Sequence, residues 1–572
     1  MSAQSVDTSD SYGSQDGRSE EPPKQQPGIR GPMFPLSYKD GFSQWWCSIP
    51  AAAAEHKVLS FMPILQHPPT HTQTGNVAAP VNGASDSLTA TDPTQADHVS
   101  VNSDSDSYGP RRWQSSMVEL SGKNRALNEF SVERVGETTE QNLVILHGYG
   151  AGLGFFYKNF EALSRAKGWQ LYALDMLGMG RSTRPAFKMR SKQRQEAITE
   201  AEDWFIDALE EWRVKRKIER FTLLGHSLGG YMAVAYALKY PGRLNKLILA
   251  SPVGIPEDPY AVTAEMPDPS ESTTGNESMQ EQSDLVADSA DVGTNVNRAQ
   301  AGGTTNGKQP SGNNSTNGPP RRPLSKWITY LWDANISPFS LIRWSGPLGP
   351  RLVSGWSSRR FAHLPPPEAQ ALHDYSYSVF RLRGSGEYAL AYILAPGAFA
   401  RSPLIRRIQG VGRQMIGASP SLFSTSTSLI SRPTESSPPS TTHSSSTSLA
   451  IVPTPEPSST QLQQQPQSST SSSFTTPPSY RENGIPVVLM YGDRDWMDAT
   501  AGYAAKAKIE EEKARILKNA SEEEKAADKG SAKVVIVKDA GHHLYLDGWE
   551  EFNEVILKEM RDVSETSKRE GS

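Results

Sequence analysis

Cysteine is almost missing from this chain of 572 residues, which holds only Cys47. A single cysteine excludes a framework of intramolecular disulfides and fits a reducing compartment. Long apolar runs are missing as well, and none approaches the ~20 residues that a bilayer-spanning helix needs. Only 36% of the residues are hydrophobic, against 42 prolines and 45 glycines. The chain therefore cannot fill its length with packed core, and folded parts must alternate with polar tracts.

An excess of charge of one sign is also missing. The formal net charge is −5 and the pI is near 6.2, so no basic field favours a nucleic acid as partner. Acidic side chains come before any apolar block, among them Asp7, Asp10 and Glu20. This pattern fits neither a secretory signal nor an acid-poor transit peptide. We therefore expect an intracellular protein.

Composition divides the chain into polar and apolar-rich stretches. The polar stretches are rich in Ser, Thr, Pro, Asn and Gln and too poor in large apolar residues to form a core. They are predicted to be a disordered start (1–35), a disordered linker (66–112), two disordered insertions (257–322 and 410–480) and a tail (564–572). The other stretches are predicted to be a tryptophan-rich segment (36–65), a core in two parts (113–256 and 481–563) and a helical cap (323–409).

Short apolar runs alternate with helical patterns through both parts of the core. Continuous apolar runs predict strands buried on both faces at 141–146, 169–174, 221–225, 244–250, 485–491 and 532–537. Helical patterns are predicted over 160–167, 193–215, 232–240, 502–526 and 549–561. The alternation predicts an α/β fold with a mostly parallel sheet and helices on both faces. The aromatic excursion at 323–409 lies between two core strands, so we expect it to cover the carboxyl edge of the sheet.

One glycine-rich stretch follows the third apolar run of the parallel set. It reads Gly225-His-Ser227-Leu-Gly229 and matches the G-x-S-x-G turn, which holds a serine in strained backbone between a strand and a helix. The flanking positions must lack side chains, because their Cβ atoms would collide where the strand meets the helix. Ser227 is therefore the predicted nucleophile.

A serine hydroxyl needs a base to take its proton, and the base needs an acid that fixes its tautomer. In this arrangement the chain order is serine, acid, histidine, each after a strand. His542 follows the last apolar run, and the acid after the preceding run is Asp495 or Asp498, with Asp495 preferred. His543 is the rival base but lacks a preceding glycine, and His226 is interpreted as a packing or orienting residue. These strand ends predict a catalytic triad.

Two backbone N–H groups are needed to bind the oxyanion of acyl transfer. One is predicted from Leu228, and the other from Tyr149, in the loop after the first apolar run. A serine nucleophile with these donors predicts attack on an ester, an acyl-enzyme, and release to water or another acceptor. The sequence contains no metal-ligand spacing and no dinucleotide-binding glycine loop, so we expect neither a metal nor a cofactor.

The segment at 36–65 contains the pair Trp45-Trp46 before a short helical run. Indole rings prefer the headgroup zone of a membrane, which makes this segment a candidate lipid anchor. The alternative is that its aromatic residues dock on the folded body of the protein. The sequence leaves both interpretations open.

Several motifs together resemble one subfamily of α/β hydrolases. They are His147-Gly-Tyr-Gly-Ala, Asp175-Met-Leu-Gly-Met-Gly-Arg-Ser, Gly225-His-Ser-Leu-Gly-Gly, Ser385-Gly-Glu-Tyr-Ala-Leu, Tyr491-Gly-Asp-Arg-Asp-Trp-Met-Asp, Gly541-His-His-Leu-Tyr-Leu-Asp and the Trp45-Trp46 block. The subfamily is similar to fungal cardiolipin-specific deacylases, lysophosphatidic acid acyltransferases and the animal lipid-droplet coactivator of a triglyceride lipase. The resemblance covers about 36–62, 118–256, 323–408 and 485–561.

The resemblance implies a phospholipid or lysophospholipid substrate and a peripheral location on a membrane or lipid droplet. Mitochondrion and lipid droplet are the implied sites, with the cytoplasm as the alternative. It also implies a His-x4-Asp pair, His542 and Asp547, which the acyltransferases share. Three functions follow: a serine-dependent phospholipid hydrolase, an acyltransferase that uses acyl-CoA, and a lipid-surface adaptor without catalysis. The animal coactivator has asparagine at the nucleophile position, so Ser227 favours catalysis.

Overall fold

The computed structural model describes residues 34–63, 108–257, 335–395, 398–416 and 480–571. Contacts divide the chain into two compact units. Of the described residues, the first unit contains those up to Val58 and Pro338–Leu382, and the second contains the others. The tracts predicted as disordered or linking at 1–35, 66–112, 257–322 and 410–480 lie almost entirely outside the described residues.

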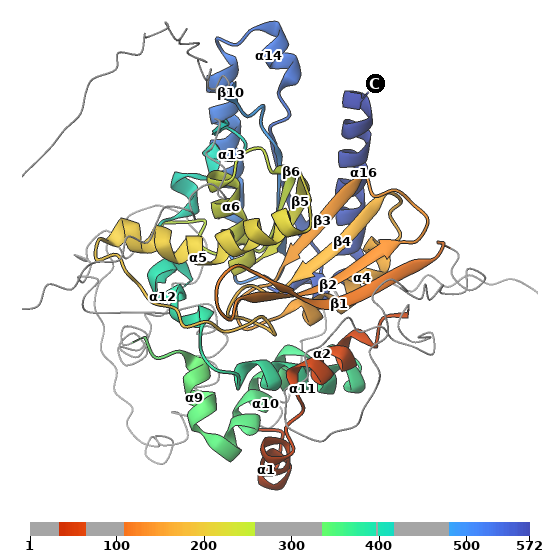
Figure 1. Ribbon diagram of the computed structural model, residues 1–572, viewed down its shortest axis with the longest axis vertical. Helices are drawn as coiled ribbons and strands as arrows, with labels where there is room; N and C mark the ends of the chain where they lie inside the picture. The colour runs from red at the N-terminus through yellow and green to blue at the C-terminus, as the bar shows by residue number, and fades with distance from the viewer. Residues whose placement is uncertain (1–33, 64–107, 258–334, 396–397, 417–479, 572) are drawn as a thin grey trace, which may run out of the picture. The chain divides into compact units, whose positions relative to one another are not determined.

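The second unit is built on an eight-stranded sheet with the order β1-β2-β4-β3-β5-β6-β11-β12 (Figure 1). The two strands at one edge form a hairpin, and β2 is antiparallel to both its neighbours. The other pairs are parallel. The strands are β1 (Arg111–Glu119), β2 (Ala126–Arg134), β3 (Gln141–Leu146), β4 (Trp169–Leu174), β5 (Phe221–His226), β6 (Leu244–Ala250), β11 (Pro486–Gly492) and β12 (Ser531–Val537). The six predicted apolar runs are thus neighbouring parallel strands.

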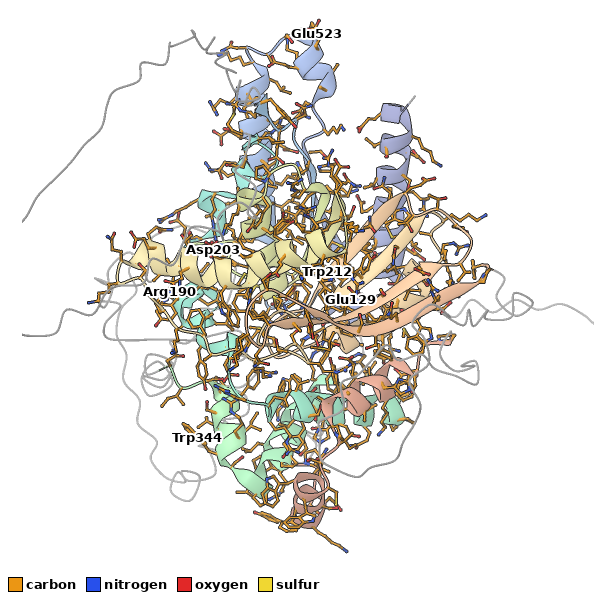
Figure 2. All side chains as sticks on the ribbon, in the orientation of Figure 1. Glu129, Arg190, Asp203, Trp212, Trp344 and Glu523 are labelled. Atoms are coloured by element: carbon orange, nitrogen blue, oxygen red, sulfur yellow. The ribbon has the colours of Figure 1, made fainter. Side chains whose placement is uncertain are left out.

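Helices of this unit pack with one another in two groups. Helix α4 (Tyr157–Leu163) contacts α16 (Trp549–Gly571), and α5 (Arg194–Lys215) contacts α6 (Leu228–Lys239). Helix α5 is also tied to β2, because Trp212 Nε1 donates to Glu129 Oε2 at 2.7 Å, and Figure 2 labels both residues. The remaining helices are α12 (Leu390–Ile393), α13 (Ala499–Leu517), α14 (Glu522–Ala527) and α15 (Leu544–Asp547).

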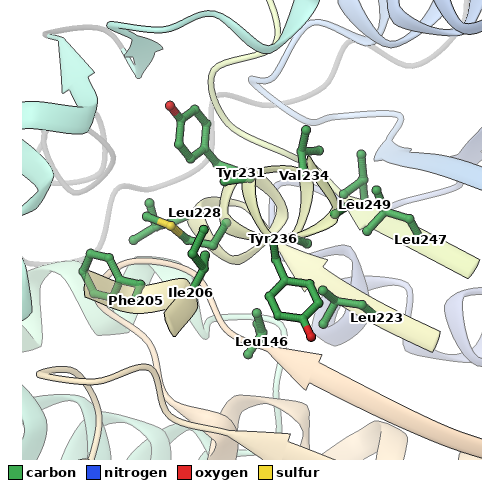
Figure 3. Packing of buried hydrophobic residues seen from close by; sticks show 14 of the residues in the cluster. Leu146, Phe205, Ile206, Leu223, Leu228, Tyr231, Val234, Tyr236, Leu247 and Leu249 are labelled. Carbon is green, nitrogen blue, oxygen red and sulfur yellow. The ribbon is translucent and has the colours of Figure 1, made fainter. Parts of the chain in front are cut away.

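The core lies between the sheet and these helices. Leu223 of β5, Leu247 of β6 and Leu146 of β3 pack with Tyr231, Val234 and Tyr236 of α6 (Figure 3). Helix α6 is buried on nearly every side, because it follows the central strand directly and lies under neighbouring elements. The elbow therefore sits in a fully buried part of the unit.

Several predicted boundaries change in the structure. Helix α6 begins at Leu228 instead of 232, because the turn at Ser227 passes straight into helix. The helix predicted over 502–526 is two helices, separated at Ser521, which caps α14. The predicted tail at 564–572 is helical through Gly571, since α16 continues past residue 561.

The first unit combines the tryptophan-rich segment with helices of the predicted cap. Its elements are α1 (Tyr38–Trp46), α2 (Ala51–Leu59), α9 (Pro338–Trp344), the short 3-10 turn η4 (Gly346–Leu348), α10 (Gly349–Arg360) and α11 (Pro366–Phe380). Gln44 of α1 donates to Asp374 of α11 at 3.1 Å, and Lys57 of α2 pairs with the same carboxylate at 2.9 Å. Polar contacts therefore dock the N-terminal helices on α11.

The predicted cap at 323–409 is divided between the two units. The part from Arg383 onward belongs to the sheet unit, where Gly386 N–H donates to Gly178 O at 3.3 Å and Leu404 N–H donates to Gly254 O at 2.8 Å. Residues 410–416, predicted to lie in an insertion, end in β9 (Met415–Ile416), which pairs with β10 (Tyr480–Arg481). Backbone hydrogen bonds to the core give these segments a fixed structure that their composition did not indicate.

Candidate active site

The predicted site residues all follow neighbouring parallel strands. Strands β5, β6, β11 and β12 are adjacent in the sheet, so their carboxyl ends lie along one edge. Ser227 follows β5, Asp495 follows β11 and His542 follows β12. The topology alone brings these three residues to the same edge.

The elbow has the strained geometry that its glycine pattern predicts. Ser227 has φ 55° and ψ −114° and is the residue before α6, a conformation that costs a non-glycine residue ~1–3 kcal/mol. A Cβ at Gly225 would lie 2.3 Å from Gly229 O, and one at Gly229 would lie 2.7 Å from Leu146 O. The requirement for side-chain-free flanks is confirmed, because backbone atoms occupy the space on both sides.

Ser227, His542 and Asp495 are joined by hydrogen bonds. Ser227 Oγ lies 2.8 Å from His542 Nε2, and His542 Nδ1 lies 3.2 Å from Asp495 Oδ1. Because a carboxylate only accepts, Nδ1 carries the proton toward Asp495 and leaves Nε2 to accept from the serine hydroxyl. The arrangement has the tautomer that a general base next to a serine requires.

The three aspartates after β11 have different partners. Asp495 faces His542, whereas Asp498 caps α13 and accepts from Thr500 N–H at 2.8 Å. Asp493 accepts from Ala540 N–H at 3.1 Å and thereby joins the two loops that carry acid and base. Of the two candidate acids, Asp495 is the one whose carboxylate contacts the imidazole.

The carboxylate of Asp495 is stabilised as an anion. Burial alone would raise its pKa, but the charge and hydrogen bond of His542, with donors from Ser251 Oγ and Met497 N–H, lower the pKa below its usual value. Its side chain is 0% exposed. A buried anion beside Nδ1 stabilises the imidazolium that forms when Nε2 takes a proton.

The loop after β3 lies against the nucleophile. A Cβ at Gly148 would be 3.1 Å from Ser227 Cβ, so the neighbouring Tyr149 belongs to the turn beside the elbow. Leu228 is the first residue of α6, where a backbone N–H has no acceptor within its own helix. The two predicted oxyanion donors thus come from segments adjacent to Ser227.

His147 holds this loop in shape. Its Nδ1 donates to Gly148 O at 2.7 Å, and its Nε2 accepts from Met176 N–H at 3.1 Å. Complete burial lowers the pKa of His147, although the carboxylate of Asp175 opposes this effect. The imidazole is therefore neutral, and it connects the loop after β3 to the loop after β4.

His226 and Asp547 hydrogen-bond to the loop that carries the base. His226 Nε2 donates to His542 O at 3.0 Å, and Asp547 Oδ2 accepts from Gly541 N–H at 3.1 Å. His543 stacks near Phe155, with ring centroids 6.1 Å apart. His542, and not its neighbour, is the histidine whose ring contacts Ser227. Asp547 has a local role in the loop that carries this histidine.

Sequence reasoning missed Ser251, the residue after β6. Its hydroxyl donates to Asp495 Oδ2, and its backbone N–H donates to Met490 O at 2.7 Å. The available signal was its position, because it directly follows the strand between the serine strand and the acid strand.

A cavity among the described residues lies away from this site. Its volume is about 860 Å³, and its lining includes Gln141, Pro486 and Ser531, which start β3, β11 and β12. These residues mark the amino edge of the sheet, opposite the carboxyl edge where Ser227 lies. Among the described residues, no group of three or more His, Cys, Asp or Glu side chains is arranged to hold a metal. A bilayer-spanning helix is likewise not found in the described ranges.

Comparison with known proteins agrees with this architecture. A family model described as alpha/beta hydrolase fold matches residues 141–282. The Arabidopsis thaliana protein named 1-acylglycerol-3-phosphate O-acyltransferase is 36% identical over 270 residues, covering 46% of this chain and 51% of the relative. The Mus musculus 1-acylglycerol-3-phosphate O-acyltransferase ABHD5 is 40% identical over 307 residues, covering 53% of this chain and 68% of the relative.

A human protein named (Lyso)-N-acylphosphatidylethanolamine lipase is 29% identical over 290 residues, covering 49% of this chain and 65% of the relative. The aligned part spans about half the length of the plant relatives: 51% of the Arabidopsis thaliana protein and 53% of a similar protein from Oryza sativa. The chain belongs to the α/β-hydrolase family, in the subfamily that includes ABHD5. Its relatives carry the names of enzymes that act on lipids.

Proposed function

We propose that this protein is a serine-dependent acyl hydrolase that acts on glycerophospholipids such as cardiolipin. The observation that carries the proposal is the hydrogen-bonded chain from Ser227 through His542 to Asp495, with distances of 2.8 and 3.2 Å. The names of the relatives support a lipid acyl substrate. Ser227 weighs against a purely adaptor function, because an adaptor does not need an activated hydroxyl.

In the proposed mechanism, Ser227 Oγ attacks the ester carbonyl carbon while His542 Nε2 takes its proton. The N–H groups of Leu228 and Tyr149 bind the oxyanion that forms. Collapse of the tetrahedral intermediate expels the alcohol oxygen, which takes the proton back from His542. Water activated by the same imidazole then attacks the acyl-enzyme and releases the fatty acid.

The second candidate is transfer of the acyl group from acyl-CoA to a lysophosphatidic acid. It is favoured by the acyltransferase names of two relatives, and by the pair His542 and Asp547 in the resemblance. The acyl-enzyme would form by expulsion of the CoA thiol, and the hydroxyl of the lysophospholipid would replace water as acceptor. The same triad serves both reactions, so only the acyl donor (phospholipid or acyl-CoA) and the acyl acceptor (water or lysophospholipid) distinguish them.

One assay set distinguishes these functions. Purified protein and Ser227→Ala are incubated with cardiolipin, with phosphatidylcholine, and with lysophosphatidic acid plus acyl-CoA. Fatty acid released from cardiolipin by the wild type alone is the expected result. Product that forms only when acyl-CoA is present would reject the hydrolase. Equal behaviour of both proteins on every substrate would reject both enzymatic functions and leave the lipid-surface adaptor.

The proposed location is the surface of a mitochondrial membrane or a lipid droplet, with the cytoplasm as the alternative. Support comes from α1, where Phe42, Trp45 and Trp46 cluster with ring centroids 5.8–6.3 Å apart. Trp46 is 72% exposed and Tyr38 is 71% exposed. Phe42 is 51% exposed as well, so the rings of Phe42 and Trp46 are available to a lipid surface.

Loss of both indoles should weaken membrane binding. We expect Trp45→Ala/Trp46→Ala to lower binding to cardiolipin-containing liposomes in co-sedimentation about thirty-fold, because each indole that leaves water contributes ~1 kcal/mol and ~1.4 kcal/mol is a factor of ten. The matched control is Tyr503→Ala on α13, an exposed aromatic residue of the other unit (53% exposed), which should bind like the wild type. Unchanged binding of the tryptophan variant would reject the anchor.

A further inference from the structure

Two serines at this edge of the sheet have a positive φ angle. Ser227 has φ 55° and Ser251 has φ 45°, and non-glycine residues rarely adopt this left-handed region. They follow adjacent strands, β5 and β6. Such strain persists where the surrounding structure holds it and often marks a functional site. The strain at Ser227 places its hydroxyl at the tip of the elbow, and the strain at Ser251 is explained by the contact of its own side chain.

The side chain of Ser251 contacts the acid of the triad. Its hydroxyl donates to Asp495 Oδ2, while Asp495 Oδ1 faces His542 Nδ1 at 3.2 Å and Met497 N–H at 3.0 Å. Each carboxylate oxygen therefore has its own donors. Three donors from different segments fix the rotation of the carboxylate about its Cβ–Cγ bond.

The backbone of Ser251 is fixed as firmly as its side chain. Its N–H donates to Met490 O of β11 at 2.7 Å, and Ser227 N–H donates to Ala250 O at 2.9 Å. Ser251 is 0% exposed. The peptide unit between Ala250 and Ser251 thus bonds to Ser227 through its carbonyl and to the acid strand through its N–H, and the buried hydroxyl of Ser251 is kept from water.

We propose that Ser251 is a positioning residue that orients the carboxylate of Asp495, so that Oδ1 faces His542 and Oδ2 is held by the hydroxyl. It does not touch the substrate and acts through Asp495. This inference rests on the proposed function of Ser227 as an acyl-transfer nucleophile. Without the hydroxyl, Oδ2 is left buried with one donor fewer and the carboxylate turns to find another. His542 Nδ1–H then loses its fixed acceptor.

A fluorophosphonate probe measures this effect without knowledge of the lipid. Ser227 Oγ forms a bond to phosphorus, fluoride leaves, and His542 takes the serine proton. The labelling rate at saturating probe reports activation of the serine, and the half-saturating concentration reports probe binding. In both Ser251→Ala and Ser251→Gly we expect the saturating rate to fall about ten-fold, the loss of one hydrogen bond to a charged group. The half-saturating concentration should stay unchanged.

The pair of variants separates positioning from stability. Alanine keeps the left-handed strain, whereas glycine accepts φ 45° without it, so the thermal midpoint of the glycine variant should equal or exceed that of the alanine variant. Similar rates in two variants of different stability support positioning. A saturating rate equal to wild type in either variant overturns it. The proposal is also overturned if the saturating rate falls in proportion to the thermal midpoint of each variant, or if both variants fail to fold.

Ser227→Ala distinguishes failure of this inference from failure of the proposed function. If Ser227→Ala is labelled like the wild type, the proposed nucleophile is wrong and the role of Ser251 is wrong with it. If only Ser227→Ala loses labelling while both Ser251 variants keep the wild-type rate, the nucleophile stands and the positioning role is rejected.

Discussion

Replacement of Ser227 by alanine should reduce hydrolysis of phospholipid and fluorophosphonate labelling at least about a thousand-fold. The hydroxyl is the atom that forms the covalent bond, and no water in its place can form an acyl-enzyme. His542 and Asp495 would keep their mutual contact, since alanine removes only the partner of Nε2. The measurement is the rate of fatty-acid release and of probe labelling, with circular dichroism to verify that the variant is folded.

The matched control is Thr222→Val, a hydroxyl deletion five residues earlier on the same chain segment. Thr222 is 0% exposed, and its Oγ1 has no hydrogen-bond partner among the described residues. Valine has the same shape, so this variant should be labelled like the wild type. Retention of more than a tenth of the wild-type rate by Ser227→Ala would contradict a serine mechanism. If Thr222→Val also lost labelling, the loss in Ser227→Ala could come from disturbed packing of the elbow instead of removal of the nucleophile.

The central part of the fold could be predicted because its signals are local. Residues 141–146 and 169–174 were predicted as strands, and the structure has the same bounds. A continuous apolar run of six residues between polar segments is typical of a strand buried on both faces. Parallel strands then place their carboxyl ends on one edge, which made the meeting of Ser227 with His542 predictable from chain order alone.

The division of the cap could not be predicted, because it depends on contacts between distant segments. Ser385 Oγ donates to Pro185 O, and a Cβ at Gly178 would lie 2.4 Å from Gly386 N. Nothing in the composition of 383–395 distinguishes it from the helices before it. The same limitation hid Ser251, since its partner Asp495 is 244 residues away in the chain.

The choice between Asp495 and Asp498 shows what local reasoning leaves open. Both are aspartates in one loop, three residues apart. Helix α13 begins right after Asp498, and its first turn takes this carboxylate as a cap. Asp495 is then the acid that remains to face His542. The sequence pattern predicts the start of this helix at 502 instead of 499, so it does not identify Asp498 as the helix cap.

Substitution of Gly225 by alanine is the second large effect that we expect. The new Cβ would lie 2.3 Å from Gly229 O and 2.7 Å from Gly230 N, and both are backbone atoms of the elbow. Neither can move like the end of a flexible side chain, so strand and helix must separate. We expect a loss of about 3 kcal/mol in the free energy of unfolding. A displacement of Ser227 by ~1 Å would also lower labelling about a hundred-fold.

Gly136→Ala is the control, because its Cβ would meet nothing within 4 Å although its φ is +79°. This variant has only the backbone penalty of ~1–2 kcal/mol and should keep the wild-type labelling rate. Urea denaturation gives the two stabilities, and the fluorophosphonate probe gives the two rates. If Gly225→Ala unfolded at the wild-type urea concentration, the space at the elbow would be open enough for a side chain. The G-x-S-x-G spacing would then have no steric cause, and its strain at Ser227 would need another explanation.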